Sequence, residues 1–340
     1  MSKNLLKRNK TILIAEACDN HFGKLDNAKK MVLAAKKAGA DVIKFQHHLP
    51  DEEMLKNVPR SKNFKISLYN FLKKNSLKIH HHKILKNFCK KNKIEYLCTP
   101  FSLKAAEELN EIGVKWFKIG SGEFTDIPFI KKVLNFNKPV ILSTGMSNQK
   151  EMDFVYKIIK THKNKKISFM NCTSEYPPKY EDINLGFIKV MKKRYPELII
   201  GHSDHTNDIA TSIGAVAVGA KIIEKHVNLK NKNYGPDKDV SITFEKFRSM
   251  VLHIRNLEKS LGEHKMIYSK ERQIRKWATR SLVALKDLKK GNKIKSNDIW
   301  SKRPGTGIPS RYMARVIGLK ILKNIKKNTL IKKNQIQKFI

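Results

Sequence analysis

The chain has 340 residues, which fits about two domains or one α/β barrel with a small appendage, and its 40% hydrophobic and 29% charged residues exclude a disordered protein. No apolar run reaches the ~18 residues of a membrane-spanning helix, so no membrane partner is expected. The formal net charge of +40 is typical of nucleic-acid binders. However, the lysines are scattered through nearly every segment and are not interleaved with aromatic residues. This distribution favours an ordinary lysine-rich surface, so no nucleic-acid partner is expected.

The first apolar run begins at Thr11 and is stopped by Glu16, so it is too short for the core of a signal peptide and predicts a buried strand. The four cysteines are widely spaced and form no CxxC pair: Cys18, Cys89, Cys98 and Cys172. This spacing argues against a disulfide framework or a structural zinc site, and it predicts a protein of the reducing cytoplasm.

Short apolar runs alternate with longer amphipathic stretches up to about residue 262. We expect strands at residues 11–17, 41–46, 94–98, 115–119, 139–143, 167–171, 198–202 and 221–226. We expect helices at residues 25–38, 79–92, 103–112, 150–161, 184–193, 208–218 and 244–261. Eight strands that alternate with helical stretches over ~250 residues predict an α/β fold, a (β/α)8 TIM barrel at residues 1–265. A doubly wound sheet is the alternative, although no GxGxxG motif follows the first strand.

Chemically capable side chains gather at the carboxyl ends of the predicted strands, where a TIM barrel carries its active site. In chain order they are Glu16, Asn20, His21, Lys44, Gln46, Thr99, Lys118, Ser121, Glu123, Ser143, Asn171, Ser174, Tyr176, His202, Ser203, His205, Glu224 and His226. A barrel without an active site has no need of polar residues at all eight strand ends.

His205 and His226 follow neighbouring strands, so their imidazoles can converge on one metal ion. Glu224 shares the face of His226, because side chains alternate along a strand. Two imidazoles leave coordination positions open for water and substrate, as in catalytic sites. Each histidine taken alone also fits an ordinary core or surface position, and it is their pairing that favours a metal.

Lys44 and Lys118 lie within apolar strand runs, where a lysine is costly unless it meets an anion. With Ser121 and Ser143 nearby they predict a phosphate-binding floor. The alternatives are lysines that extend to the barrel rim, or a lysine that forms a Schiff base.

Two further groups of residues, one of histidines and one of cysteines, are interpreted as structural rather than catalytic. His80, His81 and His82 are consecutive in a predicted helix, so they point in three directions and predict a solvated face. Cys98 and Cys172 lie near strand ends, where a nucleophile is possible, but small buried side chains are the favoured interpretation.

The pattern changes after the last predicted helix. We interpret residues 266–278 as a linker and residues 279–340 as a compact β-rich module with short strands and frequent turns. About 60 residues are few for an independent core, so docking onto another surface is expected. Within the module, a turn of Pro304 and Gly305 presents Arg303.

The strand ends of the barrel carry an ordered set of motifs: Ile14-Ala-Glu16, Asn20-His21, Lys44-Phe-Gln46, Cys98-Thr-Pro-Phe101, Phe117-Lys-Ile-Gly-Ser-Gly-Glu123, Ser143-Thr-Gly-Met146, Cys172-Thr-Ser-Glu-Tyr-Pro177, Ser203-Asp-His205, Glu224-Lys-His226 and Gly235-Pro-Asp237. The tail carries two more, Arg280-Ser-Leu282 and Lys302-Arg-Pro-Gly-Thr-Gly-Ile308. Taken together and in order, the motifs of the barrel resemble the sialic acid synthase family, which includes the N-acetylneuraminate, legionaminate and pseudaminate synthases. The tail resembles the SAF (antifreeze-like, β-clip) domain of that family.

The resemblance implies a metal-dependent condensation of phosphoenolpyruvate (PEP) with an N-acylated hexosamine, giving a nine-carbon 2-keto sugar acid and phosphate. It implies that PEP is bound by Lys44, Thr99, Lys118, Ser121, Ser143, Ser174 and Ser203. His205 and His226 would bind a divalent cation, Mn²⁺ in most relatives, with Mg²⁺ or Co²⁺ as alternatives. The catalytic residues would be these two histidines, Glu16 and the proton-transfer residue Glu123.

The acceptor sugar would be held by Glu16, Asn63, Tyr176 and Asp237. Arg303 would reach the N-acyl group from the partner subunit, which implies a domain-swapped homodimer. Three places depart from the family pattern: Ser174, where relatives often carry Asn, the segment 17–19, and the segment 46–48. The acceptor therefore stays open between N-acetylmannosamine, a diacetamido-trideoxyhexose and a 6-phosphate form. Other PEP-dependent synthases, of the 3-deoxy-octulosonate or deoxyheptulosonate phosphate type, are the enzymatic alternative, and a basic nucleic-acid-binding protein is the non-enzymatic one.

Overall fold

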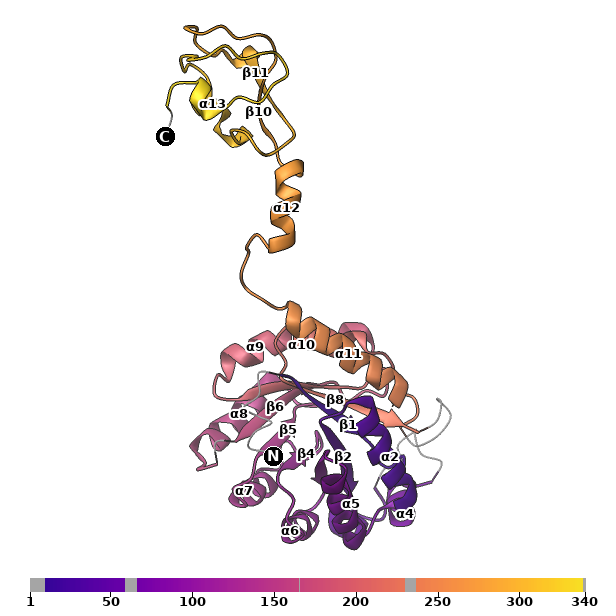
Figure 1. The fold of residues 1–340 in the computed structure, drawn as a ribbon. Helices are drawn as coiled ribbons and strands as arrows, with labels where there is room; N and C mark the ends of the chain where they lie inside the picture. The colour runs from indigo at the N-terminus through magenta and orange to yellow at the C-terminus, as the bar shows by residue number, and fades with distance from the viewer. Residues whose placement is uncertain (1–9, 59–65, 165, 230–236, 339–340) are drawn as a thin grey trace. The chain divides into compact units, whose positions relative to one another are not determined.

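A computed structural model describes residues 10–58, 66–164, 166–229 and 237–338 of the chain. The chain forms two compact units, Met1–Gly262 and Glu263–Ile340, and each is described by itself (Figure 1). Over the described ranges, every helix is too short or too polar to cross a lipid bilayer.

In the first unit, the described residues form a sheet that consists mainly of eight parallel strands. They are β1 (Ile12–Glu16), β2 (Val42–His47), β3 (Glu95–Pro100), β4 (Phe117–Ile119), β5 (Val140–Ser143), β6 (Ile167–Cys172), β7 (Ile199–Asp204) and β8 (Ile222–Asn228). Hydrogen bonding links them in the order β3-β2-β1-β8-β7-β6-β5-β4, and a short strand β9 (Ile242–Thr243) pairs with β8. Because β3 and β4 at the two ends of this order also contact each other, the sheet curls into a nearly closed barrel. The predicted (β/α)8 barrel is confirmed.

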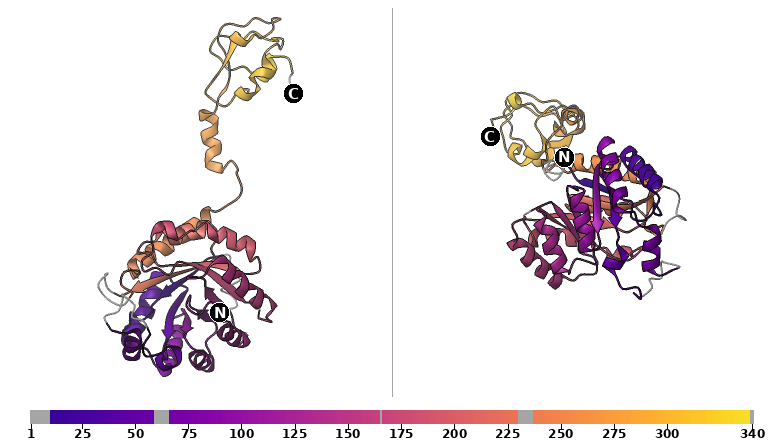
Figure 2. Two further views of the ribbon diagram at one scale, coloured as in Figure 1. Left: turned by 180° about the vertical axis from the view of Figure 1, so that it is seen from behind. Right: turned by 90° about the horizontal axis from the view of Figure 1, so that it is seen from below.

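Helices lie around the outside of the strands (Figures 1 and 2). They are α2 (Leu25–Ala38), α3 (Pro50–Glu53), α4 (Leu68–Asn75), α5 (Ile79–Lys91), α6 (Leu103–Glu111), α7 (Ile127–Asn135), α8 (Gln149–Thr161), α9 (Phe187–Arg194), α10 (Ala210–Ala217) and α11 (Phe244–Ser260), with a 3₁₀ turn η1 (Tyr180–Asp182) before α9. The prediction did not include α3, α4 or α7. Asp126 caps the N-terminus of α7, because its side chain accepts a hydrogen bond from the backbone N–H of Phe129 at 3.1 Å.

Side chains alternate between the helices and the barrel interior along each strand. In β1, Leu13 and Ala15 pack outward into the main core, whereas Ile12 and Ile14 pack inside the barrel. The apolar floor of the interior consists of Ile12, Ile14, Val42, Leu97, Trp116, Ile141, Met170 and Ile222. The inward-facing series continues toward the carboxyl ends with buried charged residues: Glu16, Lys44, Lys118 and Glu224. The floor therefore supports a polar layer directly above it.

The three consecutive histidines differ from the prediction at one position. His80 is exposed, but His82 is fully buried. Its Nδ1 lies 2.7 Å from the hydroxyl of Tyr96, because α5 turns this face toward β3. The interpretation of a solvated face was therefore wrong for His82.

The second unit has its own small core. The antiparallel strands β10 (Ser281–Ala284) and β11 (Ile299–Lys302) pair, and the remaining elements are the short helices η2 (Ser296–Asp298), η3 (Ser310–Tyr312), α13 (Met313–Val316) and η4 (Lys333–Gln335). Leu282, Ile299, Val316, Ile321 and Ile331 are among its buried residues. A helix, α12 (Ser269–Ala278), occupies most of the segment interpreted as a linker.

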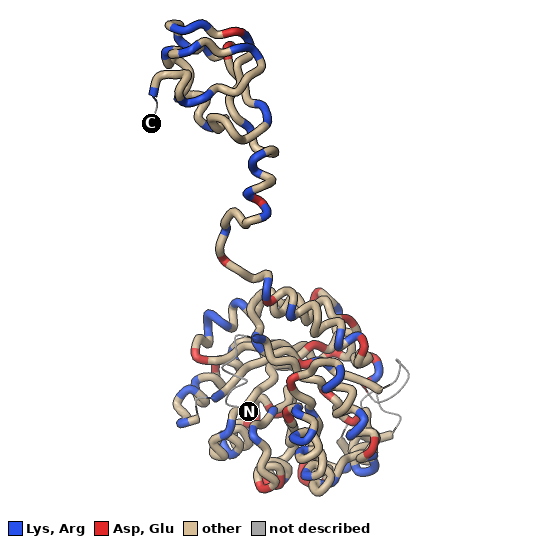
Figure 3. The backbone as a smooth tube through the Cα atoms, viewed as in Figure 1, with Lys and Arg blue, Asp and Glu red and all other residues tan. Residues whose placement is uncertain are grey.

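Figure 3 shows Lys and Arg spread over the helices of the barrel and over the second unit.

Candidate functional site

A cavity of about 650 Å³ opens at the carboxyl ends of the barrel strands. Nearly all residues singled out from the sequence for catalysis or binding line it: Glu16, Lys44, Thr99, Lys118, Ser121, Glu123, Ser143, Ser174, Tyr176, Ser203, His205, His226 and Asp237. Asn63 lies outside the described residues. The barrel thus brings together residues that are scattered over more than 200 positions of sequence.

Arg303 belongs to the second unit, which is described by itself. Its Nε donates a hydrogen bond to the carbonyl of Ala278 at 3.1 Å. Its guanidinium carbon lies 5.8 Å from the ring centroid of Trp277, within cation–π distance.

A buried charge network forms the bottom of the cavity. Lys44 Nζ lies 3.0 Å from Glu224 Oε1 and 3.4 Å from Glu16 Oε2, and Lys118 Nζ lies 3.2 Å from the same Glu224 oxygen. Ser203 donates a third hydrogen bond to that oxygen, at 3.0 Å. The charged side chains are at most 4% exposed. Glu224 is therefore the shared counter-ion of both lysines, a role that the sequence did not predict.

The two lysines respond differently to burial. Burial opposes the charge of Lys44, but the carboxylates of Glu16 and Glu224 more than offset it and raise the pKa of Lys44. For Lys118, burial prevails, and the neighbouring charge of Lys44 adds to it, so the pKa of Lys118 is lowered. Burial also opposes the charge of Glu224, yet Lys118 and Lys44 lower the pKa of this carboxyl. An anion that enters the cavity meets two lysines whose neighbouring carboxyl groups are those of Glu224 and Glu16.

Hydroxyl groups line the same cavity as the two lysines. The Oγ1 of Thr99 and the Oγ of Ser143 are buried and have no hydrogen-bond partner within the described part of the chain. Ser121 and Ser174 lie beside Cys172, with oxygen–sulfur distances of 3.7 Å and 4.0 Å. Since buried polar groups are nearly always hydrogen-bonded, the free hydroxyls of Thr99 and Ser143 suit an oxygen-rich ligand.

The two histidines lie on the same side of the cavity, with ring centroids 5.2 Å apart. His205 Nδ1 donates to the carbonyl of Thr173 at 2.7 Å, so its Nε2 is the acceptor that faces the Tyr176 hydroxyl at 3.2 Å. His226 Nδ1 is buried, lies 3.5 Å from Asp237 Oδ2, and makes no hydrogen bond to any described residue. These nitrogens are suited to hold a cation.

Glu123 follows β4 and lines the cavity. Burial, with a smaller contribution from Glu53, raises the pKa of Glu123 to about 7. Its Oε2 is buried without a hydrogen-bond partner among the residues described. A carboxyl group in this state can accept or donate a proton near neutral pH.

A hydrogen-bonded chain orients Glu16 from the second strand. Gln46 Nε2 donates to Glu16 Oε1 at 3.0 Å, and His48 Nε2 donates to Gln46 Oε1 at 3.0 Å. His48 Nδ1 in turn lies 2.9 Å from Glu53 Oε2. The segment that departs from the family pattern thus fixes a carboxylate of the cavity. The sequence offered one signal for this, since Lys44 and Gln46 share the inward face of β2.

Of the two cysteines considered as nucleophiles, one lies in the core and the other lines the cavity. Cys98 is fully buried in the core, where burial raises the pKa of its thiol. Cys172 lines the cavity. Burial opposes its thiolate, but His205 lowers the pKa of Cys172 to about 7.

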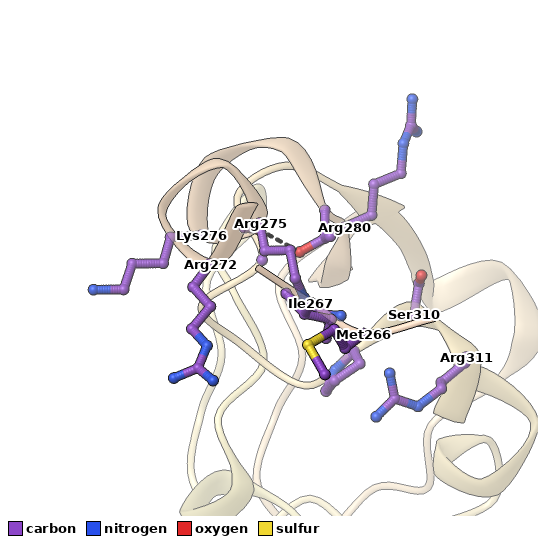
Figure 4. A pocket seen from close by; sticks show the side chains of 11 residues that line it. Met266, Ile267, Arg272, Arg275, Lys276, Arg280, Ser310 and Arg311 are labelled. Carbon is purple, nitrogen blue, oxygen red and sulfur yellow. Dashed lines mark hydrogen bonds between the residues drawn. The ribbon is translucent and has the colours of Figure 1, made fainter. Parts of the chain in front are cut away.

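A second cavity, of about 670 Å³, lies in the second unit (Figure 4). It is lined by five basic residues, Arg272, Arg275, Lys276, Arg280 and Arg311, together with Met266 and Ile267. Figure 4 shows the side chains of Arg272, Lys276 and Arg280 pointing in different directions. The barrel cavity is therefore the candidate active site, because its charged groups converge on one place.

Comparison with known proteins agrees with the geometry. The model of the NeuB family matches residues 31–266, and that of the SAF domain matches residues 279–337. The N,N'-diacetyllegionaminic acid synthase of Campylobacter jejuni is 36% identical over 337 residues, which cover 95% of this chain and 99% of that protein. The N-acetylneuraminate-9-phosphate synthase of Homo sapiens is 31% identical, over 94% of this chain and 90% of that protein.

A solved structure is similar as well. The N-acetylneuraminic acid (sialic acid) synthetase from Leptospira borgpetersenii superposes with a TM-score of 0.71 at 31% identity, covering 78% of this chain and 90% of that chain.

Proposed function

Because the chain belongs to the NeuB family, we propose that it condenses PEP with the open-chain aldehyde of an N-acylated hexosamine. C3 of PEP forms a bond to the aldehyde carbon, water adds at C2, and inorganic phosphate leaves. The product is a nine-carbon 2-keto sugar acid. N-acetylmannosamine and a 2,4-diacetamido-trideoxyhexose are the two acceptors to be tested first, followed by a 6-phosphate form.

The observation that carries this proposal is the pair of buried lysines in one cavity with free hydroxyls. PEP bears a phosphate and a carboxylate, and both need cationic and hydroxyl donors. Lys44 and Lys118 supply the charge, and Thr99 and Ser143 supply unused hydrogen-bond donors within the described residues. Ser121, Ser174 and Ser203 complete the PEP-binding set that we propose.

The histidines support a divalent cation in the same cavity. His226 Nδ1 is buried without a hydrogen bond in the part of the chain that is described, and His205 Nδ1 is already bound to a backbone carbonyl, which directs Nε2 inward. These features fit Mn²⁺, Mg²⁺ or Co²⁺ held by His205 and His226. When bound, such an ion polarises the aldehyde oxygen as a Lewis acid.

The remaining residues are assigned by their place in the cavity. Glu123 exchanges the proton that the attacking water loses, because its raised pKa keeps both protonation states accessible near neutral pH. Glu16, Tyr176 and Asp237 bind the sugar hydroxyls, and Asn63 is assigned to the same group by the family pattern. Burial raises the pKa of Glu16, and the nearby ammonium group of Lys44 opposes that rise.

We further propose that the enzyme works as a homodimer in the cytoplasm. The SAF domain carries Arg303, which would enter the partner subunit's cavity and contact the N-acyl group. The cysteines within the described ranges are all unpaired, which suits a reducing compartment.

The test is an assay of phosphate release. The full chain is incubated with Mn²⁺, PEP and each candidate sugar, and the product is identified by mass. Reactions without PEP or without sugar are the controls, and arabinose 5-phosphate and erythrose 4-phosphate test the alternative sugar-phosphate synthases, which the SAF match disfavours. If no N-acyl hexosamine releases phosphate in the presence of metal, the proposal is rejected.

A further inference from the structure

Cys18 lies beside the proposed cation site, although no role has been assigned to it so far. It follows β1 by two residues, and its side chain is almost fully buried, at 7% exposure. Its φ is +46°, in the left-handed region that residues with side chains seldom adopt. The backbone thus holds a thiol in an unfavourable conformation at the wall of the cavity.

Three different donor atoms meet at this point. The Cys18 sulfur, a ring nitrogen of His226 and a carboxylate oxygen of Asp237 all lie within 4.8 Å of one another. They come from three separate segments: the loop after β1, the strand β8, and the chain that follows β8. Such a convergence of sulfur, nitrogen and oxygen donors is typical of a metal site.

The donors are also unsatisfied. His226 is 4% exposed, and its Nδ1 has no hydrogen-bond partner among the described residues. Asp237 Oδ2 is likewise buried without a hydrogen-bond partner in the described ranges. The two atoms lie 3.5 Å apart without a hydrogen bond between them, and since buried polar atoms rarely remain unpaired, a shared ligand would satisfy both.

We propose that the Cys18 thiolate is a ligand of the cation that the proposed function assigns to His205 and His226, with Asp237 as a further oxygen donor. This inference rests on the proposed function and adds one property to it, the preference of the site among metals. Thiolate ligands favour borderline-soft ions such as Zn²⁺ and Co²⁺, whereas Mn²⁺ and Mg²⁺ favour oxygen donors. The site therefore binds Co²⁺ and Zn²⁺ in preference to Mn²⁺.

The binding step is balanced by one proton. The thiol of Cys18 loses its proton to solvent, and the sulfur forms a bond to the ion.

The other cysteine in the cavity, Cys172, is less suited to this role, because its nearest histidine nitrogen already makes a hydrogen bond. Cys172 Sγ is 3.9 Å from His205 Nδ1, which is bound to the carbonyl of Thr173.

Co²⁺ is the probe, because a cobalt–thiolate bond gives a charge-transfer absorption band in the near ultraviolet. The full chain is freed of metal and titrated with CoCl₂ in the absence of PEP and sugar. We expect the band in the wild type and in Cys172→Ser, and its loss in Cys18→Ser and Cys18→Gly. Glycine suits the positive φ at this position, so Cys18→Gly controls for misfolding, which circular dichroism verifies.

Affinity gives a second readout. Competition between Co²⁺ and Mn²⁺ is measured for the wild type and for Cys18→Ser. Loss of a residue that contacts a metal ligand, but not the metal, typically lowers metal affinity by ~10–100-fold. Loss of a direct ligand should cost more, so we expect Cys18→Ser to weaken Co²⁺ binding by a larger factor than this. We expect it to weaken Mn²⁺ binding less than Co²⁺ binding.

The outcomes are distinct. A band that persists in Cys18→Ser, or that disappears in Cys172→Ser alone, overturns the assignment to Cys18. If Co²⁺ binds without a band and His205→Ala abolishes that binding, the thiolate inference fails while the two-histidine site and the proposed function stand. If Co²⁺ does not bind at all, the inference also fails, and the phosphate-release assay then decides the proposed function independently.

Discussion

Substitution of Glu224 by Gln tests the charge balance at the bottom of the cavity. Glu224 Oε1 lies 3.0 Å from Lys44, 3.2 Å from Lys118 and 3.0 Å from the Ser203 oxygen. Glutamine keeps the shape and one acceptor oxygen but removes the negative charge. Of the two buried ammonium groups, Lys44 is then left with Glu16, whose pKa is raised by burial, at 3.4 Å.

The size of the effect follows from burial. Removal of one partner from a buried ion pair costs ~3–5 kcal/mol, and we expect the lower end because an acceptor remains. For a domain of about this size, each kcal/mol lowers Tm by ~2–4 °C, so a loss of ~3 kcal/mol corresponds to ~6–12 °C. PEP restores an anion to the two lysines, so it should raise the Tm of the variant more than that of the wild type.

Differential scanning calorimetry with and without PEP measures both effects. Glu181→Gln is the matched control, because Glu181 is 77% exposed and its contact with Lys179 is 3.8 Å long. We expect that control to behave as the wild type. A Glu224→Gln protein that melts within about 2 °C of the wild type, or that PEP stabilises less than the wild type, would refute the shared counter-ion.

Three further substitutions address the chemistry. His205→Ala should abolish turnover and weaken metal binding in calorimetric titrations, because it removes one of the two imidazoles; normal activity with chelated metal would exclude this site. Arg303→Ala should raise the KM for the acceptor about tenfold or more, as expected for a charged hydrogen bond worth ~1.5–3 kcal/mol, and should leave the KM for PEP nearly unchanged. An unaltered acceptor KM would separate the SAF domain from catalysis. Glu123→Gln should lower kcat by ~10²–10⁴-fold. In the wild type, activity should fall as the pH drops through about 7, because the raised pKa leaves Glu123 protonated below that value. The same acid limb in the Gln variant would assign the proton to another group.

Much of the barrel could be predicted because its signal is local. Short apolar runs and amphipathic stretches reflect the periods of strands and helices, and these periods are read from neighbouring residues. The motifs at the strand ends resembled the sialic acid synthase family, and the match to the NeuB and SAF models confirms that resemblance. The barrel also made it possible to predict which residues would line one cavity, since all strands point their carboxyl ends to the same side.

Other features were missed because they depend on partners distant in sequence. His82 was assigned to solvent, since nothing near it reveals that α5 places it against Tyr96 of β3. Cys18 had no assigned role, because its closeness to His226 follows from the pairing of β1 with β8 at opposite ends of the barrel domain.

The sequence by itself determined the class of fold, the order of the strands and of most barrel helices, and the family. Only the tertiary structure decided which charges neutralise one another. Glu224 can serve Lys44 and Lys118 together because β8, β2 and β4 direct alternate side chains into one closed interior. In that low-dielectric space, distances of 3.0–3.2 Å set the protonation of each group, and no local pattern of residues encodes such distances.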